Sequence, residues 1–454
     1  MSISSQTIHH DILRSLHFLH IPKTAGTSIR TWLMDLYSEK DWLPCHFLEE
    51  LETFTSEEIK KYHFFSGHLG INWYDKLPNP PHTFTWLRQP LAREISQYYY
   101  IKNTIDFLLS LSHSPLKADY LNAVHHLSMS ELYKSSAYLG FYDNLQVRFL
   151  AGIFPQKQQE PIYCDDNILN IAKENLLNLF FWGICELMED SVALFNYSLG
   201  IPPRPLNRSL NKREKANIDY KPSEEECNII QNVNHYDQKL YSFAKSIFQE
   251  KIRNFTEDIN LYFAPYPQKH KDYHQKKVDY LRINFQQKHQ SVSRFTKINF
   301  NFSEAVFLEN WYPRFYYNPI NKWLRWAGPE NTSYIYIPLA ENNNYQISFT
   351  IFYIMSPEIL DSLSLWVGDT KIELDIQKNY HNEQLVTYQL KGIIGEHLIS
   401  SSNPYTPLKF VFSQTIPMEI SNHDGEVVEI QYVSFATDGL SIKPFNTQTT
   451  MLLC

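Results

Sequence analysis

The stretch HIPKTAGTS, residues 20–28, places a lysine, a glycine and three hydroxyl side chains between an apolar run and a helical pattern. Strand, tight loop and helix follow in this order where proteins bind phosphate-like anions, because backbone N–H groups and the positive end of the helix dipole converge there. Lys23 adds a mobile positive charge, and Gly26 allows the backbone to approach an anion closely. The loop predicts an anion site, although an ordinary capped turn fits the loop taken alone equally well.

A nucleoside triphosphatase or nucleotide kinase is the first alternative for such a loop. Its motif is G-x-x-x-x-G-K-[ST], and a later apolar strand ends in an aspartate that serves the metal ion. Here Lys23 stands before Gly26, and the later strand candidate HTFTWLRQP ends in Arg88. These differences favour a site that holds phosphate groups by direct contact with basic side chains, with no metal ion.

HIPKTAGTS followed by WLRQPLAREISQYYY resembles the paired phosphate-binding loops of the Golgi-type carbohydrate sulfotransferases, whose relatives include heparan sulfate 2-O-sulfotransferase. The resemblance covers roughly residues 16–265, and the segments NLQVRFLAG and FWGICELMEDSVALF agree with it more weakly. It implies a P-loop-like α/β domain and 3′-phosphoadenosine 5′-phosphosulfate (PAPS) as sulfuryl donor. The first loop would hold the 5′-phosphosulfate and the second loop the 3′-phosphate.

The resemblance assigns roles to individual residues. Lys23 matches the lysine that stabilises charge on the departing phosphate, while Arg88 and Ser96 match the ligands of the 3′-phosphate. Arg93 either assists them or is a surface arginine of a helix, and most of the tyrosine triplet 98–100 is expected to pack in the core or against the donor loop. The expected contacts of the 5′-phosphosulfate are Lys23, Thr24, Ala25, Gly26, Thr27 and Ser28.

The general base is sought in HFFSGHLGINWY, residues 63–74, between the two loops. His68 matches the catalytic histidine of the family, and an imidazole can remove a hydroxyl proton near neutral pH. Ser66 stands where the 2-O-sulfotransferases have a second histidine, so a two-histidine arrangement is in doubt. A structural role for a single histidine remains the alternative. Fallback bases are His63, His82 and Asp75.

A basic segment, NRSLNKREK at residues 207–215, follows the α/β pattern. Arg208, Lys212 and Arg213 stand roughly where relatives close over the nucleotide, so they could contact the donor or an acidic acceptor. A solvated charged face is the slightly favoured interpretation of such a run.

The segments that would position these residues follow two patterns. Residues 1–265 alternate short apolar runs with helical stretches, which predicts a sulfotransferase domain with a central parallel sheet. Residues 266–295, rich in Lys, His and Gln, are expected to be a linker that can be partly helical. Residues 296–454 contain short alternating runs separated by Asn, Gly, Pro and Ser, which predicts an all-β sandwich of jelly-roll type as an accessory domain.

An aromatic segment, ENWYPRFYYNPINKWLRWAGP at residues 309–329, opens two interpretations of the second domain. Exposed rings could stack on sugar faces, with Arg314 and Arg325 available for acidic groups. Alternatively, the rings form the sandwich core and the domain serves as a scaffold. The second interpretation is favoured.

The bulk composition narrows the class of protein. The chain has 454 residues, with 43% hydrophobic and 20% charged residues, as in a folded soluble protein of two or three domains. A net charge of -8 argues against a nucleic-acid partner. The five scattered cysteines fit reduced thiols, and no apolar run is long enough for a membrane span, so we expect a cytoplasmic protein of bacterial type.

Three classes of function remain open at this stage. The favoured one is a PAPS-dependent sulfotransferase that acts on a hydroxyl of a glycan or glycoconjugate, by in-line transfer with a histidine base. A nucleotide kinase is the second. The third is a catalytically idle binding protein that uses the β-sandwich, and the joint presence of Lys23, His68, Arg88 and Ser96 speaks against it.

Overall fold

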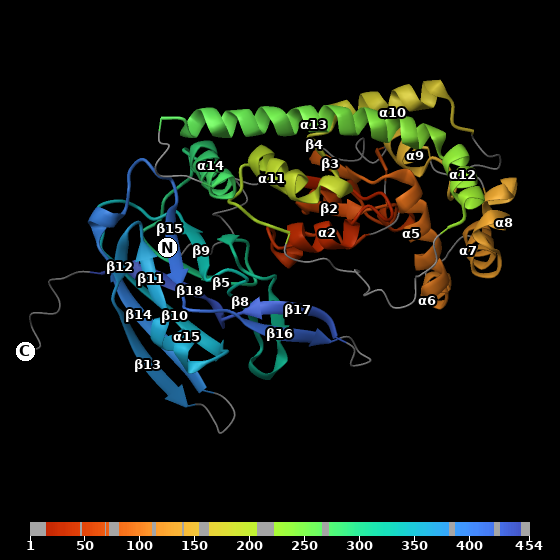
Figure 1. The fold of residues 1–454 in the computed structure, drawn as a ribbon. Coiled ribbons are helices and arrows are strands. Elements are labelled where there is room, and N and C mark those ends of the chain that lie inside the picture. Colours follow the sequence, from red (N-terminus) through yellow and green to blue (C-terminus); the bar gives the residue numbers. More distant parts are fainter. Residues whose placement is uncertain are drawn as a thin grey trace, which may run out of the picture.

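The chain folds into an α/β region followed by a β-rich region (Figure 1). Within the described residues, no helix is both long and apolar enough to cross a lipid bilayer. The computed structural model describes residues 15–45, 48–68, 70–71, 81–110, 115–138, 140–153, 163–206, 222–265, 272–380, 386–421 and 427–445.

The α/β region is built on a sheet of four parallel strands in the order β2-β1-β3-β4. All four residues of β1 are buried, as is typical of an inner strand of a parallel sheet. Leu19 pairs with Gly67, and Leu87 pairs with Ile184, so all four carboxyl ends lie at one edge. The strands are β1 (Leu16–Leu19), β2 (Phe64–Gly67), β3 (His82–Leu87) and β4 (Phe181–Ile184). The predicted central parallel sheet is confirmed.

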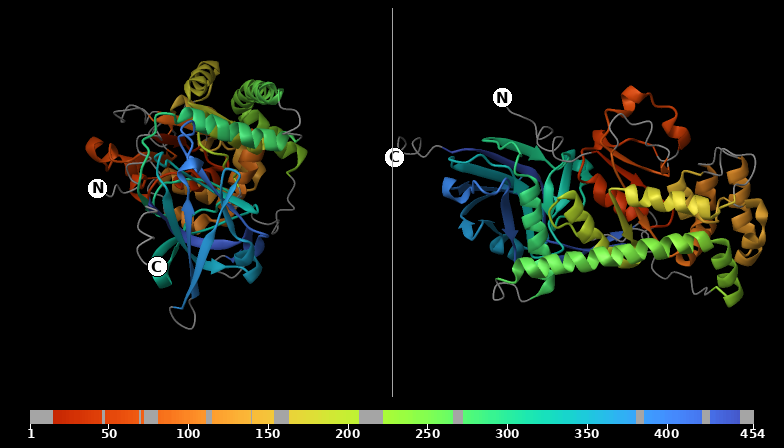
Figure 2. Two further views of the ribbon diagram at one scale, coloured as in Figure 1. Left: turned by 90° about the vertical axis from the view of Figure 1, so that its left-hand side faces the viewer. Right: turned by 90° about the horizontal axis from the view of Figure 1, so that it is seen from above.

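Helices surround this sheet, and the longest, α13, runs along the α/β region and ends near the β-rich region (Figures 1 and 2). The described helices of this region are α2 (Gly26–Met34), α3 (Leu48–Leu51), α4 (Ser56–Ile59), α5 (Pro90–Asn103), α6 (Ile105–Ser110), α7 (Pro115–His126), α8 (Met129–Lys134), α9 (Leu145–Ala151), α10 (Asp166–Asn178), α11 (Met188–Leu199), α12 (Glu224–Val233) and α13 (His235–Phe263). Short 3-10 turns are η1 (Glu39–Asp41), η3 (Ser136–Tyr138) and η5 (Cys185–Leu187).

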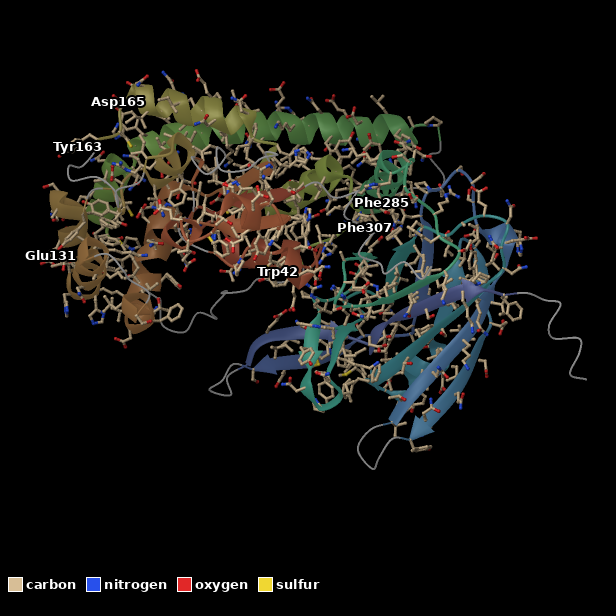
Figure 3. All side chains as sticks on the ribbon, turned by 180° about the vertical axis from the view of Figure 1, so that it is seen from behind. Trp42, Glu131, Tyr163, Asp165, Phe285 and Phe307 are labelled. Atoms are coloured by element: carbon tan, nitrogen blue, oxygen red, sulfur yellow. The ribbon has the colours of Figure 1, made fainter. Side chains whose placement is uncertain are left out.

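Helix α14 (Tyr273–Lys288) lies in the segment expected to be a linker, and it joins the two regions. The ring of Phe285 packs 5.1 Å from that of Phe307 in the β-rich region (Figure 3). The Arg282 guanidinium lies 2.6 Å from the buried carboxylate of Glu309. The side-chain amide of Asn284 donates to the backbone carbonyl of Tyr197, in α11, at 2.9 Å, so α14 is bound to the α/β region as well.

The β-rich region contains antiparallel sheets, as predicted, and its two larger sheets share one hydrophobic core. The larger sheet has the order β13-β14-β10-β18-β8-β7, with β5 paired to β18, the second has the order β12-β11-β15-β9-β6, and β16 pairs with β17. The jelly-roll class remains a prediction. The elements are β5 (Ile298–Asn301), β6 (Phe307–Glu309), β7 (Phe315–Tyr317), η6 (Asn318–Ile320), β8 (Lys322–Trp326), β9 (Thr332–Ile337), β10 (Tyr345–Ile354), α15 (Pro357–Ser362), β11 (Ser364–Val367), β12 (Thr370–Ile372), β13 (Leu374–Tyr380), β14 (Val386–Ile394), η7 (Glu396–Leu398), β15 (Thr406–Val411), β16 (Ile416–Ser421), β17 (Val427–Val433) and β18 (Phe435–Pro444).

The aromatic segment 309–329 is only partly buried. Trp311, Tyr312 and Trp326 are buried, whereas Tyr316 is 42% exposed. Arg325 is fully buried, so it is not a surface cation available to a glycan. Trp311 belongs to the sandwich core, as the favoured interpretation expects, whereas Tyr312 and Trp326 lie in a smaller separate cluster with Val433 and Ala436.

Candidate functional site

The loop between β1 and α2 has the backbone of an anion cradle. Lys23 and Ala25 adopt left-handed conformations, with φ values of 68° and 62°, which are uncommon for residues other than glycine. Ala25 is the N-cap of α2, makes no side-chain capping bond, and no acidic residue lies in the first turn of α2. The leading N–H groups of this helix are therefore not neutralised by a local carboxylate, which suits a negatively charged ligand.

The hydroxyl side chains of the loop differ in their surroundings. Thr24 is buried, and its hydroxyl donates to the carbonyl of Ile21 at 2.9 Å. This bond braces the loop, so Thr24 offers a ligand its backbone rather than its hydroxyl. Ser28 is also buried, whereas Thr27 is exposed.

Gly26 is required by a close approach of His20, which the sequence analysis did not single out. A Cβ atom at position 26 would lie 1.6 Å from Nε2 of His20. The His20 ring stacks on Phe18 with 5.2 Å between ring centroids. Since any side chain at position 26 would displace the imidazole, the glycine and the histidine form one unit of packing.

His68 follows β2 at the same edge of the sheet. Its Nδ1 lies 2.8 Å from the backbone carbonyl oxygen of His20, and the two imidazole rings are 4.4 Å apart. A carbonyl only accepts a hydrogen bond, so Nδ1 carries the proton, and in the neutral ring the basic lone pair belongs to Nε2. The half-buried His68 is thus held in the tautomer whose unprotonated nitrogen is Nε2.

The fallback bases lie elsewhere or are not described. His63 directly precedes β2, and His82 is the first residue of β3, so both stand at the amino edge of the sheet, opposite the loop. Asp75 lies outside the described residues. Among these candidates, His68 is the one that the described structure places beside the loop.

Arg88 follows β3 and faces the loop between β1 and α2. Its Nη1 donates to the carbonyl of Lys23 at 3.0 Å. The side chain of Gln146, on α9, makes two hydrogen bonds with the backbone of Arg88. Its Oε1 accepts from the Arg88 N–H, and its Nε2 donates to the Arg88 carbonyl, at 2.9 Å each. The next N–H, of Gln89, donates to Glu186 at 2.9 Å. The sequence analysis assigned no role to Gln146 or Glu186, although each lies within a segment quoted for the resemblance.

Helix α9 is itself fixed by a buried carboxylate. Asp237 accepts hydrogen bonds from the backbone N–H groups of Gln146 and Val147, at 3.1 and 2.8 Å. Burial raises the pKa of Asp237, while nearby Arg93 opposes the shift. Through Gln146, this cap supports the position of Arg88.

Arg93 is buried and not a surface arginine, so that alternative was wrong. Its side chain is ion-paired with Glu94, and its Nη1 lies 3.5 Å from the carbonyl oxygen of Pro22. Helix α5 therefore contacts the loop between β1 and α2 through Arg93.

Lys23 and Ser96 are related through Tyr100. The Nζ of Lys23 lies 4.0 Å from the centroid of the Tyr100 ring. Ser96 and Tyr100 are four residues apart on α5, so they share one helix face. The half-buried Ser96 therefore lies on the face of α5 that Lys23 contacts through Tyr100. Tyr98 is buried in the core and donates to the carbonyl of Leu127 at 2.8 Å.

The basic segment 207–215, with Arg208, Lys212 and Arg213, lies outside the described residues. The described part of the chain contains no group of three or more His, Cys, Asp or Glu side chains placed to hold a metal ion.

Comparisons with known proteins were made on the whole chain. No family model matches it. The chain is 22% identical over 277 residues to heparan-sulfate 6-O-sulfotransferase 3-B of Danio rerio, which covers 52% of this chain and 64% of that protein. It is 25% identical over 279 residues to heparan-sulfate 6-O-sulfotransferase 3 of Mus musculus, covering 52% and 58% of the two chains. Heparan-sulfate 6-O-sulfotransferase 1-B of Danio rerio is 22% identical over 280 residues, covering 52% and 66%.

In each case the matched stretch spans less than two thirds of the relative. These relatives are named as 6-O enzymes, whereas the loop motifs resemble those of a family that includes the 2-O-sulfotransferases. Over about half its length, this chain is a distant relative of carbohydrate sulfotransferases that carry the heparan-sulfate name.

Proposed function

We propose that this protein is a sulfotransferase that moves a sulfuryl group from PAPS to a hydroxyl of a glycan or glycoconjugate. The observation that carries the proposal is the convergence of Lys23, His68 and Arg88 around the uncapped start of α2. The distant similarity to heparan-sulfate 6-O-sulfotransferases supports the same reaction class. The acceptor position is left open, because neither the 2-O nor the 6-O assignment rests on a described contact.

The residues at this edge fit a donor with two phosphate positions. PAPS supplies an activated sulfuryl group on its 5′-phosphate and a second anchor in its 3′-phosphate. The backbone of residues 24–28 and the start of α2 suit the first, because their N–H groups and helix dipole favour a negative charge. Arg88 and Ser96 are assigned to the second, where a planar guanidinium can bind a phosphate with two parallel hydrogen bonds.

Each residue has one role in the transfer step. His68 takes the proton of the acceptor hydroxyl on Nε2, since Nδ1 is engaged with the carbonyl of His20. The acceptor oxygen forms a bond to sulfur while the bond from sulfur to the phosphate oxygen breaks. Lys23 stabilises the charge that develops on this phosphate oxygen. Positioning and charge stabilisation supply most of the rate in the related phosphoryl transfers.

The proposal extends to the domain organisation. A sulfotransferase domain at residues 1–265 and a linker at 266–295 precede a β-sandwich accessory domain of jelly-roll type at 296–454. Because α14 contacts Tyr197 of the α/β region and Phe307 and Glu309 of the β-rich region, this linker packs against both regions. The accessory domain then keeps a fixed position beside the donor helix α2.

The deciding experiment is isothermal titration of the full chain with 3′-phosphoadenosine 5′-phosphate, the desulfated product. We expect micromolar binding without magnesium, loss of binding in Arg88→Ala, and weak binding of ATP. Preferential binding of ATP with magnesium would support a kinase instead, and absence of binding by both nucleotides would support an idle site. A positive result leads to an acceptor screen with labelled sulfate on glycans.

A further inference from the structure

A cavity of about 30 Å³ lies where helix α2 meets the β-rich region. Thr31 and Trp32 of α2 form one wall, Arg204 forms a second, and Asn310 and Tyr312 of the β-rich region form a third. Ser28, in the first turn of α2, also lines the cavity. Figure 1 shows α2 between the parallel sheet and the strands of the β-rich region. Lys23, His68 and Arg88 are not among the described residues that line the cavity, which shares Ser28 with the start of α2.

Two of the side chains that line the cavity carry buried hydrogen-bond donors that are not used. Nη1 of Arg204 and Nε1 of Trp32 make no hydrogen bond to any described residue. The Arg204 side chain is 10% exposed, and Trp32 is 5% exposed. A buried donor without an acceptor is unfavourable, and a charged donor more so, which indicates that an acceptor belongs in the cavity.

The charged side chains behind this wall indicate that the acceptor is negatively charged. Asp35, at the end of α2, is paired with Arg204 at 2.8 Å and with Arg325 of β8. Arg325 is fully buried, and its Nε and Nη2 make no hydrogen bond to a described residue. A third guanidinium, of Arg314, donates to the carbonyls of Ser303 and Tyr37 at 2.9 Å each. Three arginines thus surround one directly paired carboxylate.

The pKa shifts of Asp35 and Arg314 agree with an excess of positive charge in this cluster. Burial alone would raise the pKa of Asp35, but Arg325 and Arg204 outweigh it and hold that pKa below its ordinary value. Burial, with repulsion from Arg325, lowers the pKa of Arg314 to about 10. Asp35 and the more distant Glu39 counteract that shift only in part. The cluster therefore carries positive charge that Asp35 does not neutralise.

We propose that this cavity is a binding site for a small inorganic anion of halide size. The anion accepts hydrogen bonds from Nη1 of Arg204 and Nε1 of Trp32, and it offsets the positive charge that Asp35 leaves uncompensated. A water molecule needs about 10–15 Å³ of such space, so the volume suits one small occupant rather than an organic ligand. An anion here joins α2, which begins at the donor loop, to the β-rich region.

Diffraction tests the site directly. Crystals of the full chain, grown in sodium gluconate and soaked in sodium bromide, are expected to show an anomalous peak beside Arg204 Nη1 and Trp32 Nε1. Gluconate is too large for the cavity and serves as the reference anion. Bromide peaks elsewhere in the crystal, with water or no density in the cavity, would overturn the proposal.

Thermal unfolding in solution tests the same site without crystals. At constant ionic strength, replacing gluconate by bromide is expected to raise Tm in a saturable manner, because the anion binds the folded chain. The measurement is made in a Lys23→Ala, Arg88→Ala background, which removes one basic side chain from each proposed phosphate position of the donor site. Persistence of the effect there separates this site from the proposed sulfotransferase function, which can fail independently.

Variants then connect the effect to the two donors. Trp32→Phe keeps the ring and removes one donor, and it is expected to raise the half-saturating bromide concentration about tenfold or more. Arg204→Gln is expected to abolish the effect. If Arg204→Gln fails to fold, Trp32→Phe still decides. An unchanged bromide response in Trp32→Phe, or equal Tm in bromide and gluconate for the parent, contradicts the proposal.

Discussion

Nδ1 of His68 donates to the backbone carbonyl of His20 at 2.8 Å, which ties the end of β2 to the first residue of the donor loop. The same His20 places its ring where a side chain at position 26 would stand. One residue thus sets both the tautomer of the candidate base and the identity of the loop glycine.

Replacing His68 by glutamine should remove the general base. We expect kcat for sulfuryl transfer to fall by about 10²- to 10⁴-fold, the usual contribution of a positioned base. Binding of 3′-phosphoadenosine 5′-phosphate, measured by titration calorimetry, should stay close to that of the parent. The matched control is His82→Gln at the opposite edge of the sheet, where kcat should hardly change. Equal losses in the two variants would argue against His68 as the base.

The two hydrogen bonds between the Gln146 side chain and the Arg88 backbone should strengthen nucleotide binding. Arg88→Ala is expected to weaken binding of 3′-phosphoadenosine 5′-phosphate by about tenfold to hundredfold, because a charged hydrogen bond contributes about 1.5–3 kcal/mol. Gln146→Leu keeps the side-chain size and loses both bonds to the Arg88 backbone, so a smaller loss in the same direction should follow. The surface variant Gln238→Leu is the control. Full affinity in Gln146→Leu would show that Arg88 does not need these hydrogen bonds.

The packing of Gly26 against His20 predicts that the effect of Gly26→Ala on stability changes sign when the His20 ring is removed. Gly26→Ala should lower the free energy of unfolding, since its Cβ meets the His20 ring, although alanine is intrinsically favoured in a helix by about 1 kcal/mol. In the His20→Ala background, the same Gly26→Ala change should be neutral or stabilising. Urea unfolding of the four proteins measures this. A destabilisation of the same size in both backgrounds would mean that His20 is not the obstacle.

The ring of Tyr100 should keep Lys23 in place. Tyr100→Leu removes the aromatic face beneath Nζ, and we expect kcat to fall about two- to fivefold, in line with about 0.5–1 kcal/mol for an accessible cation–π contact. Tyr100→Phe keeps the face and should retain nearly full activity. If the phenylalanine variant loses as much as the leucine variant, the hydroxyl rather than the ring is responsible.

Asp35 should make stability depend on acid pH. Its pKa is lowered in the folded chain, so its stabilisation is present above the unfolded pKa near 3.9 and is lost as the pH falls from about 5 through the folded value. Asp35→Asn leaves buried arginines without their partner and should cost about 3–5 kcal/mol at pH 7.

The loss on acidification should then be smaller in Asp35→Asn than in the parent, as measured by chemical unfolding at several pH values. Glu57→Gln, which breaks an exposed pair with Lys60, should leave the unfolding free energy nearly unchanged. A parent-like acid response in Asp35→Asn would assign the effect to other carboxylates.

The sequence by itself determined the elements that form the site. The apolar run before HIPKTAGTS and the strand ending in Arg88 predicted two parallel strands, and parallel strands bring their carboxyl ends to one edge. Lys23 and Arg88 follow these two strands, so the pattern was sufficient to expect both at that edge, whereas His68 was expected there only through the resemblance to the sulfotransferase family. The short alternating runs after residue 296 likewise predicted antiparallel strands, because their period matches a sheet with one buried face.

Tertiary structure alone decided which side chains support that site. The roles of Gln146 and Glu186 depend on how α9 and η5 pack against the end of β3, which no local pattern encodes. Arg325 and Asp35 are 290 residues apart, and composition gave no reason to pair them. Local periodicity reports which face of an element is buried, whereas the partner on that face is chosen by packing across the whole chain.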